Sequence, residues 1–183
     1  GIAPALLTGE QEATASYLGA TADLPPSELP TMIIDIGGGS TELACHYEGR
    51  LVAFSMQLGC VRVSEATFHE PRVTPNEDAA ARAMIETEID RLFASVPSFA
   101  ELVGRVRLVG LAGTVATVAQ LDAGLTTYDR DAVHHRVITR DGVHEWYERL
   151  ANETAIERLA RPGMVPGRED VLVGGLLILE LVM

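Results

Sequence analysis

Apolar and polar residues follow one another along the chain in patterns that predict an α/β fold. Residues 32–36 form a short apolar run between Pro30 and three glycines, which is typical of a buried strand. Two more apolar segments, joined around Glu48-Gly49-Arg50, predict a β-hairpin that extends the same sheet. A later apolar run predicts a fourth strand. These three strands are expected over residues 43–47, 51–56 and 106–111.

Helical patterns occur before, between and after these strands. Thr8 and Gln11 have the spacing of a capping box, which predicts that a helix begins there and runs to about residue 22. After Asn76, apolar residues recur at three- and four-residue spacing until Pro97, as in an amphipathic helix. The fourth strand leads through a glycine turn into a helix that ends at about residue 121. Other helices are expected over residues 76–95, 142–152, 154–160 and 168–183.

The last predicted helix contains the longest apolar run, residues 171–183, which Glu180 interrupts. A membrane span needs roughly 18 or more apolar residues, so this run predicts a buried helix. The chain begins without a methionine and stops inside this helix, so we expect both ends to be cuts in a longer polypeptide. A buried helix that lacks its sheet partner exposes apolar surface, which predicts self-association, most simply as a homodimer.

Composition and charge narrow the class of protein. The chain of 183 residues carries 14 Lys and Arg against 26 Asp and Glu, a net charge of −12, which argues against nucleic-acid binding. A phosphate-rich ligand would have to be held by local backbone dipoles and a metal ion. Cys45 and Cys60 are too few for a disulfide framework and suit reduced packing residues in a cytoplasmic protein. No export signal is evident at the start of the chain.

The residues that follow the first strand, 35–42, read Asp-Ile-Gly-Gly-Gly-Ser-Thr-Glu and have the chemistry of a phosphate cradle. Three glycines let the backbone approach an anion and point N–H groups at it. Ser40 and Thr41 add hydroxyl donors, Asp35 can hold Mg²⁺, and Glu42 can orient a water or a metal ligand. The alternative is a tight glycine turn between two strands, with Asp35 buried. The glycines Gly37, Gly38 and Gly39 fit neither a P-loop nor a dinucleotide fingerprint.

A second glycine turn follows the fourth predicted strand. Gly113 and Thr114 open a helix there, and the N–H groups at a helix N-terminus form a potential anion site. The alternative is a helix start chosen only for its geometry. Arg62 is a weak candidate for a phosphate contact, and the alternative for this arginine is an ion pair with a neighbouring carboxylate such as Glu65.

Four segments of the chain resemble, in order, the exopolyphosphatase and guanosine pentaphosphate phosphohydrolase family, the Ppx/GppA family of the actin-like ATPase superfamily. The resemblance is carried by Thr-Gly-Glu-Gln-Glu-Ala and the residues after it, by the glycine loop, by Gly-Cys-Val-Arg and by Gly-Leu-Ala-Gly-Thr. These segments are residues 8–19, 35–42, 59–62 and 110–114. The third looks like a turn that follows the hairpin.

The resemblance implies an actin-like, ribonuclease H-like α/β domain with a mixed sheet, an antiparallel hairpin and flanking helices. It also implies that residues 1–183 are the second, C-terminal domain, without the first domain and the final strand. The expected activity is Mg²⁺-assisted release of the terminal phosphate from inorganic polyphosphate or guanosine pentaphosphate, by water attack in an interdomain cleft. The family's catalytic glutamate falls on Glu12, as general base. With one wall of the cleft, this chain alone is expected to be inactive.

Two other readings stay open. One is a non-catalytic module that binds a phosphorylated nucleotide or polyphosphate, and the other is an actin-like kinase or chaperone ATPase.

The chain also departs from the family at Arg130, where the family has proline, and at His135, where it has glycine. Adjacent side chains of an extended chain point to opposite sides, so His134 and His135 are not expected to bind one ion together. Trp146 is expected to anchor a core or a domain interface.

Overall fold

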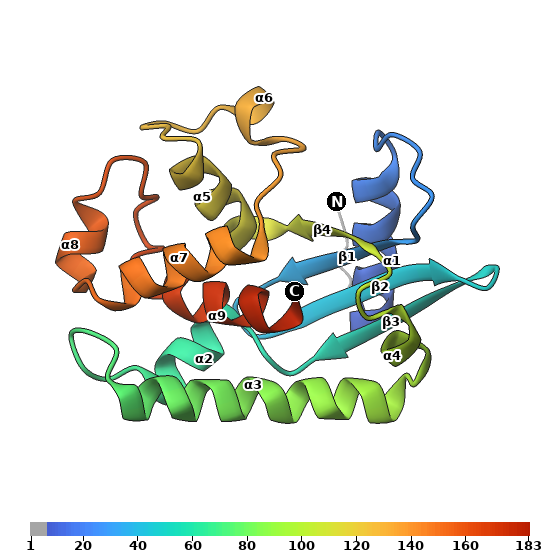
Figure 1. The fold of residues 1–183 in the computed structure, drawn as a ribbon, viewed down its shortest axis with the longest axis horizontal. Coiled ribbons are helices and arrows are strands. Elements are labelled where there is room, and N and C mark those ends of the chain that lie inside the picture. The colour runs from blue at the N-terminus through green and yellow to red at the C-terminus, as the bar shows by residue number, and fades with distance from the viewer. Residues whose placement is uncertain (1–6) are drawn as a thin grey trace, which may run out of the picture.

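A four-stranded mixed sheet organises the chain in the computed structural model, which describes residues 7–183 (Figure 1). The sheet order is β3-β2-β1-β4; β1 is antiparallel to β2 and parallel to β4. Glu48 and Gly49 both have positive φ angles, 50° and 78°, as a two-residue hairpin turn requires. All four predicted strands are confirmed. Their bounds are β1 (Thr31–Ile36), β2 (Thr41–Tyr47), β3 (Arg50–Met56) and β4 (Arg107–Leu111).

All six predicted helices, including the one after the fourth strand, are present within a few residues of their expected bounds. They are α1 (Gly9–Thr21), α3 (Pro75–Ser95), α5 (Ala112–Asp122), α7 (Arg140–Ala151), α8 (Ala155–Leu159) and α9 (Leu172–Val182). The expected capping box of Thr8 and Gln11 is confirmed. Three short helices were not predicted: α2 (Cys60–Thr67), α4 (Ser98–Leu102) and α6 (Arg130–Val133). Gly59-Cys60-Val61-Arg62 is therefore a helix start and not only a turn.

Alternate residues of β1 point to two different layers. Ile33 packs with Ala13 of α1 on one face, whereas Ile34 and Ile36 face the larger core formed with α2, α3, α5 and α9. Among the described elements, α1 thus covers one side of the sheet, and α2, α3, α5 and α9 lie on the opposite side (Figure 1). Cys45 is buried in the larger core with a free thiol, as expected of a packing residue.

The apolar helix α9 is buried inside the chain. Residues 172–180 are all buried, and the helix contacts α2, α3, α5 and α7. This confirms the predicted buried helix but contradicts the reason given for self-association, since the helix already has packing partners. Within residues 7–183, no helix has the length and apolar character that crossing a membrane requires.

Two glycines of α9 bring the starts of α2 and α5 close to each other. A Cβ on Gly174 would lie 2.7 Å from Ser64 Oγ of α2, and a Cβ on Gly175 would lie 2.5 Å from Thr114 Oγ1 of α5. Side chains at these positions would push both helices outward. The pair therefore fixes the two helices that follow the candidate binding loops.

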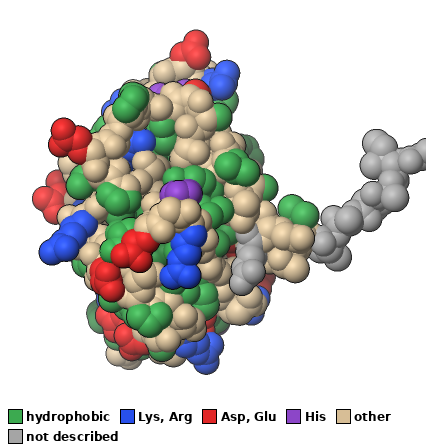
Figure 2. Space-filling view, turned by 90° about the vertical axis from the view of Figure 1, so that its right-hand side faces the viewer, with side chains coloured by type: hydrophobic (Ala, Val, Ile, Leu, Met, Phe, Trp, Pro, Cys, Tyr) green, Lys and Arg blue, Asp and Glu red, His purple; other side chains and the backbone are tan. Residues whose placement is uncertain are grey.

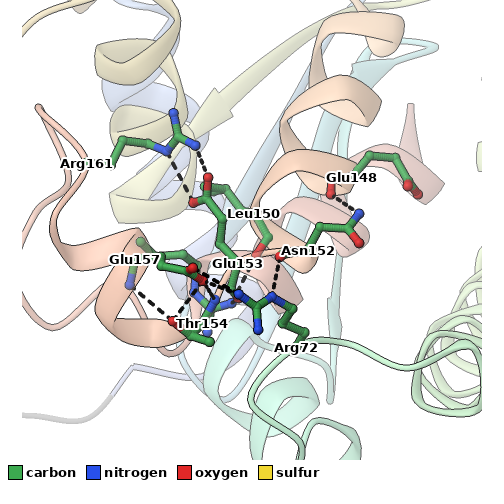
Figure 3. Close-up of polar contacts among 9 residues, drawn as sticks. Arg72, Glu148, Leu150, Asn152, Glu153, Thr154, Glu157 and Arg161 are labelled. Atoms are coloured by element: carbon green, nitrogen blue, oxygen red, sulfur yellow. Dashed lines mark hydrogen bonds and ion pairs between the residues drawn. The ribbon is translucent and has the colours of Figure 1, made fainter.

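A polar network at the junction of α7 and α8, shown in Figure 3, also reaches the segment that leads into α9. The buried Arg158 side chain donates to the carbonyls of Leu150 at 3.0 Å, Glu153 at 2.6 Å and Glu169 at 2.5 Å. Arg72 adds a bidentate ion pair with Glu157, with both N···O distances at 2.9 Å (Figure 3). These bonds anchor the backbone beside Arg168, whose side chain packs on the second glycine turn. Trp146 is half-buried at the edge of the core, as expected of an anchor.

Candidate phosphate-binding site

The glycine loop after β1 is held from one side by the first turn of α2. The backbone N–H of Cys60 donates to the Gly37 carbonyl at 2.9 Å. The backbone N–H of Arg62 donates to the Gly38 carbonyl at 3.1 Å, and its Nε donates to the Gly39 carbonyl at 2.9 Å. These bonds satisfy N–H groups that a helix start otherwise leaves without an acceptor. The loop is therefore the cap of α2, which explains why a helix begins there.

Gly59 makes this contact possible. A Cβ at this position would overlap the Gly38 carbonyl and lie 2.6 Å from the Gly39 nitrogen. The obstacle is backbone, which cannot swing aside as the end of a side chain can. Only glycine lets the two segments pass at this distance.

The free N–H groups of the loop point away from α2. In a planar trans peptide, the carbonyl and the following N–H lie on opposite sides. Because the three glycine carbonyls face α2, the N–H groups of Gly38, Gly39 and Ser40 face the other way. Among residues 7–183, none of these three N–H groups has an acceptor, whereas the Gly37 N–H closes the turn on the Ser40 carbonyl at 3.0 Å. Successive N–H groups turned to one side form an anion-binding concavity.

Carboxylates line the α1 side of the sheet next to this loop. Asp35 of β1 pairs with Glu42 of β2, and Glu42 pairs with Ser55 of β3, so the three side chains lie side by side. Ser55 Oγ donates to Glu42 Oε1 at 2.7 Å, and Ser16 Oγ of α1 donates to Asp35 Oδ2 at 2.9 Å. Both carboxylates are thus held in place by hydroxyl groups.

Glu12 approaches the same carboxylates from α1. A Cβ on Gly9 would lie 2.6 Å from the Ser55 Cβ, so glycine lets the first turn of α1 sit directly on β3. Glu12 is exposed, and its charge acts on Glu42. Burial raises the pKa of Glu42 above its usual value, hydrogen bonds from Ser55 and Ser40 oppose this, and the charges of Glu12 and Asp35 add to the increase. The three acidic groups therefore form one electrostatic unit.

This set of residues fits a magnesium ion. In the part of the chain that the structure describes, no basic side chain is ion-paired with Glu12, Asp35 or Glu42. Their oxygens are not close enough together for one ion to bind all three. Mg²⁺ does not need such a cage, because it is usually bound through one or two carboxylates, waters and substrate phosphates. Asp35 and Glu42 are the neighbouring pair that would hold it.

Ser40 and Thr41 lie on different sides. The Ser40 side chain lowers the pKa of Glu42 and so belongs with the carboxylate group. Thr41 is fully buried, and its cross-strand partners Ile36 and Met56 belong to the larger core. Because adjacent strand residues alternate, its hydroxyl points away from Glu42. The structure gives no support to a direct contact between the Thr41 hydroxyl and a phosphate.

The second glycine turn lies beside the first, since β4 runs parallel to β1 and Leu111 pairs with Asp35. Ala112 has a φ of +66°, so a residue other than glycine makes the left-handed turn into α5. The Thr114 side chain is 1% exposed, and its hydroxyl has no partner among the described residues. It packs on Gly175 and not toward the open end of the helix.

The Arg168 side chain packs on this second turn. The sequence pattern did not predict this contact. A Cβ on Gly113 would overlap the Arg168 guanidinium group, which places that group directly on the turn. Within residues 7–183, its side chain has no recorded hydrogen-bond or ion-pair partner. The α5 N-terminus also has no side-chain cap. No local pattern signals this contact, because it joins segments distant in the sequence.

The Arg62 side chain holds the glycine loop and, in the described region, does not form the alternative ion pair with Glu65, while its expected contact with a phosphate stays a prediction. Its Nε clamps the Gly39 carbonyl. Its exposed guanidinium borders a shallow groove. The groove is lined by Gly38, Gly39, Val61, Arg62, Glu65 and Ala66.

His134 and His135 lie on the same side of the chain, which corrects the expectation from alternation. His135 has a φ of +60°, so the chain is not extended there, and the two rings stack with centroids 3.8 Å apart. Both rings face Asp23. This cluster lies outside the carboxylate and glycine-loop residues described above.

The fold and the site define a class of protein: an actin-like α/β domain with a glycine loop, whose N–H groups point outward, at the end of its first strand. The family model of the Ppx/GppA phosphatase family matches residues 1–183. The chain belongs to the Ppx/GppA phosphatase family. It is 34% identical over 180 residues to "Exopolyphosphatase 2" of Mycobacterium tuberculosis, covering 98% of this chain and 55% of that protein.

Solved structures agree with this assignment. The crystal structure of an exopolyphosphatase-like protein superposes with a TM-score of 0.89 at 31% identity, over 100% of this chain and 58% of that one. The Ppx/GppA family member of Aquifex aeolicus gives a TM-score of 0.80 at 27% identity, over 95% of this chain and 54% of that one. This confirms the predicted actin-like fold class. The chain spans a little more than half the length of these relatives.

Proposed function

We propose that this chain forms the phosphate-binding wall of a hydrolase that releases the terminal phosphate of inorganic polyphosphate or guanosine pentaphosphate. One observation carries the proposal: among the described residues, three N–H donors without acceptors sit next to carboxylates without basic partners. The first set suits a terminal phosphate, and the second suits a cation and an attacking water. The 34% identity to a protein named exopolyphosphatase supports the substrate class.

The residues take distinct roles. Gly38, Gly39 and Ser40 bind the oxygens of the terminal phosphate through their N–H groups. Glu12, the exposed member of the acidic group, takes a proton from water as the water attacks phosphorus. Asp35 and Glu42 hold Mg²⁺, which, when bound, neutralises the charge that develops on the phosphate oxygens. Ser16 and Ser55 keep the two carboxylates oriented.

Two cations give an overall acidic chain its local attraction for a polyanion. The net charge is −12, and on the face that Figure 2 shows, arginine side chains are scattered and form no continuous patch. Arg62 and Arg168 instead lie at the two glycine turns, where β1 and β4 end. We assign them to the phosphate chain behind the terminal group. In this proposal, backbone N–H donors and two separate arginines bind the phosphate chain, and no broad basic surface is needed.

The rest of the cleft belongs to a further domain, as the half-length match to the relatives suggests. Phosphoryl transfer depends on positioning from both walls, so residues 1–183 alone should turn over little substrate. A homodimer of the whole protein and a cytoplasmic location stay predictions.

The test is phosphate release from polyphosphate, guanosine pentaphosphate and ATP with Mg²⁺, by the longer polypeptide and by residues 1–183 side by side. We expect release from one or both of the first two substrates, and only by the longer polypeptide. Release from ATP to an acceptor would point to an actin-like kinase. Tight binding of polyphosphate without any release would point to the non-catalytic binding module.

A further inference from the structure

We propose that Asp23, His134 and His135 form a binding site for a divalent transition-metal ion such as Zn²⁺, separate from the phosphate-binding site. His134 Nε2 lies 2.9 Å from Asp23 Oδ2, and His135 Nε2 lies 3.7 Å from Asp23 Oδ1. One ligand atom from each of the three side chains lies within 4.8 Å of the other two. Among the described residues, this is the one group of three acidic, histidine or cysteine side chains that is this close.

The backbone of His135 creates the arrangement. Its φ of +60° lies in the left-handed region, which residues other than glycine rarely adopt. This conformation turns the two neighbouring rings to one side, where they stack at an interplanar angle of 28°. Histidine at a position where left-handed geometry favours glycine adopts an unfavourable backbone conformation. The site is therefore set by an unfavourable local conformation that brings two imidazoles together.

The spacing suits a small ion. A tetrahedral Zn²⁺ ion with bonds of about 2.0–2.1 Å holds its ligand atoms roughly 3.3 Å apart. The observed separations of 2.9 and 3.7 Å from Asp23 to the two imidazoles bracket that spacing. Modest ring rotations would therefore admit the ion, with water at the remaining positions. All three side chains are exposed, so an ion can enter from solvent.

The ligand types select a different metal from the one expected at the carboxylate group. Imidazole nitrogens favour Zn²⁺, Co²⁺, Ni²⁺ or Cu²⁺, whereas Mg²⁺ prefers oxygen ligands only. A neighbouring cation does not compete for Asp23, because Arg136 is engaged with Asp122 at 2.7 and 2.9 Å. The hydrogen bond between His134 Nε2 and Asp23 Oδ2 is the contact that a bound ion would replace, with Asp23 as its anionic ligand.

An ion at this site would join two parts of the chain that are far apart in sequence. Asp23 follows α1, the helix that carries Glu12 and Ser16, while the histidines follow α6. Binding would tie the C-terminal end of α1 to the segment between α6 and α7. A ligand that binds only the folded state raises the melting temperature, so zinc should stabilise the protein.

The direct test is titration of the full-length protein with Zn²⁺ by calorimetry, and with Co²⁺ by visible absorption, in excess Mg²⁺ that occupies the oxygen-ligand site. We expect one equivalent to bind and the melting temperature to rise. Asp23→Asn and His135→Gly should each weaken binding at least tenfold. Glycine suits the left-handed φ, so His135→Gly should fold at least as well as the natural chain. His46→Ala, at an exposed histidine of β2, is the matched control and should bind normally.

Two results would overturn the proposal. One is the absence of zinc binding at millimolar concentration. The other is unchanged binding in both Asp23→Asn and His135→Gly, which would place the ion elsewhere on the chain.

Discussion

The two glycine turns lie side by side at the ends of β1 and β4, yet they are built in opposite ways. In the first, the carbonyls of the loop are held by α2, so that its N–H groups are left free. In the second, the chain passes straight into α5 through Ala112, and the polar Thr114 side chain is buried. The first turn has carboxylates on its α1 side and Arg62 on its α2 side, whereas Arg168 lies on the second turn.

The difference shows that glycines alone do not define a phosphate loop. At Gly38 and Gly39, bonds from helix α2 to the carbonyls orient the peptide planes so that the N–H groups point outward. At Gly113, the absence of a side chain leaves the space that the Arg168 guanidinium group occupies. In the proposed function, the first turn binds the terminal phosphate, and Arg168 at the second turn contacts the phosphate chain behind it.

Replacing Gly59 by alanine should have the largest effect among the changes that break the first turn. The new Cβ would overlap the Gly38 carbonyl, so the loop must move. Overpacking of this kind costs about 1–3 kcal/mol, and a displacement of about 1 Å at a catalytic site can reduce the rate roughly 100-fold. Urea unfolding and phosphate release measure the two effects. Gly19→Ala is the control, because a Cβ there meets nothing within 4 Å; unchanged activity in Gly59→Ala would contradict the loop geometry.

Asp35→Asn should come next, because it changes the charge beside the first turn but not its shape. Asparagine can still accept from Ser16 Oγ, so stability should change little. Loss of one preorganised electrostatic group typically lowers the rate by about 10²-fold. The Mg²⁺ concentration for half-maximal phosphate release should rise as well. Asp90→Asn, on the exposed side of α3, is the control; an unchanged Mg²⁺ dependence in Asp35→Asn would exclude Asp35 as a ligand.

The second turn should respond more weakly. Arg168→Gln should raise KM about tenfold with little change in kcat, because a hydrogen bond to a charged group contributes about 1.5–3 kcal/mol. Gly113→Ala should have a smaller effect, since the flexible guanidinium can swing aside where the backbone at Gly59 cannot. Steady-state kinetics with long and short polyphosphate distinguish these effects. If kcat of Arg168→Gln fell as much as that of Asp35→Asn, the proposed functional difference between the two turns would be wrong.

A change far from both turns should affect stability only. Glu77 caps α3 and accepts from the N–H groups of His69, Glu70 and Thr74, which lower its pKa from 4.5 to about 2. Because the folded pKa is depressed, its contribution is complete above pH 4.5 and disappears as the pH falls toward 2. Glu77→Gln should lower the melting temperature at pH 7, with a gap that narrows in acid. A gap that stays constant with pH would contradict the role of the charge.

Local patterns predicted those parts of the molecule that depend on local forces. The apolar run of β1, the capping box at Thr8 and the order of the glycine loop and its flanking acids were all legible in the sequence. Alternation along β2 also accounts for the opposite directions of Thr41 and Glu42. These features need only neighbouring residues.

The missed features depend on contacts between distant segments or on an unusual backbone angle. Helix α2 begins where loop carbonyls cap it, and Arg168 reaches Gly113 only because the Arg158 network anchors its segment. His134 and His135 share one side because His135 is left-handed. Sequence periodicity carries no signal for any of these.

The most direct test of the central claim compares substrate binding and turnover in Glu12→Gln of the full-length protein. The account predicts that polyphosphate binds with nearly natural affinity, since the loop N–H groups are intact, while phosphate release falls by about 10²–10⁴-fold with the loss of a general base. Glu86→Gln, at an exposed glutamate of α3, should leave both unchanged. Near-natural turnover in Glu12→Gln would contradict the account and make Glu12 an ordinary surface residue.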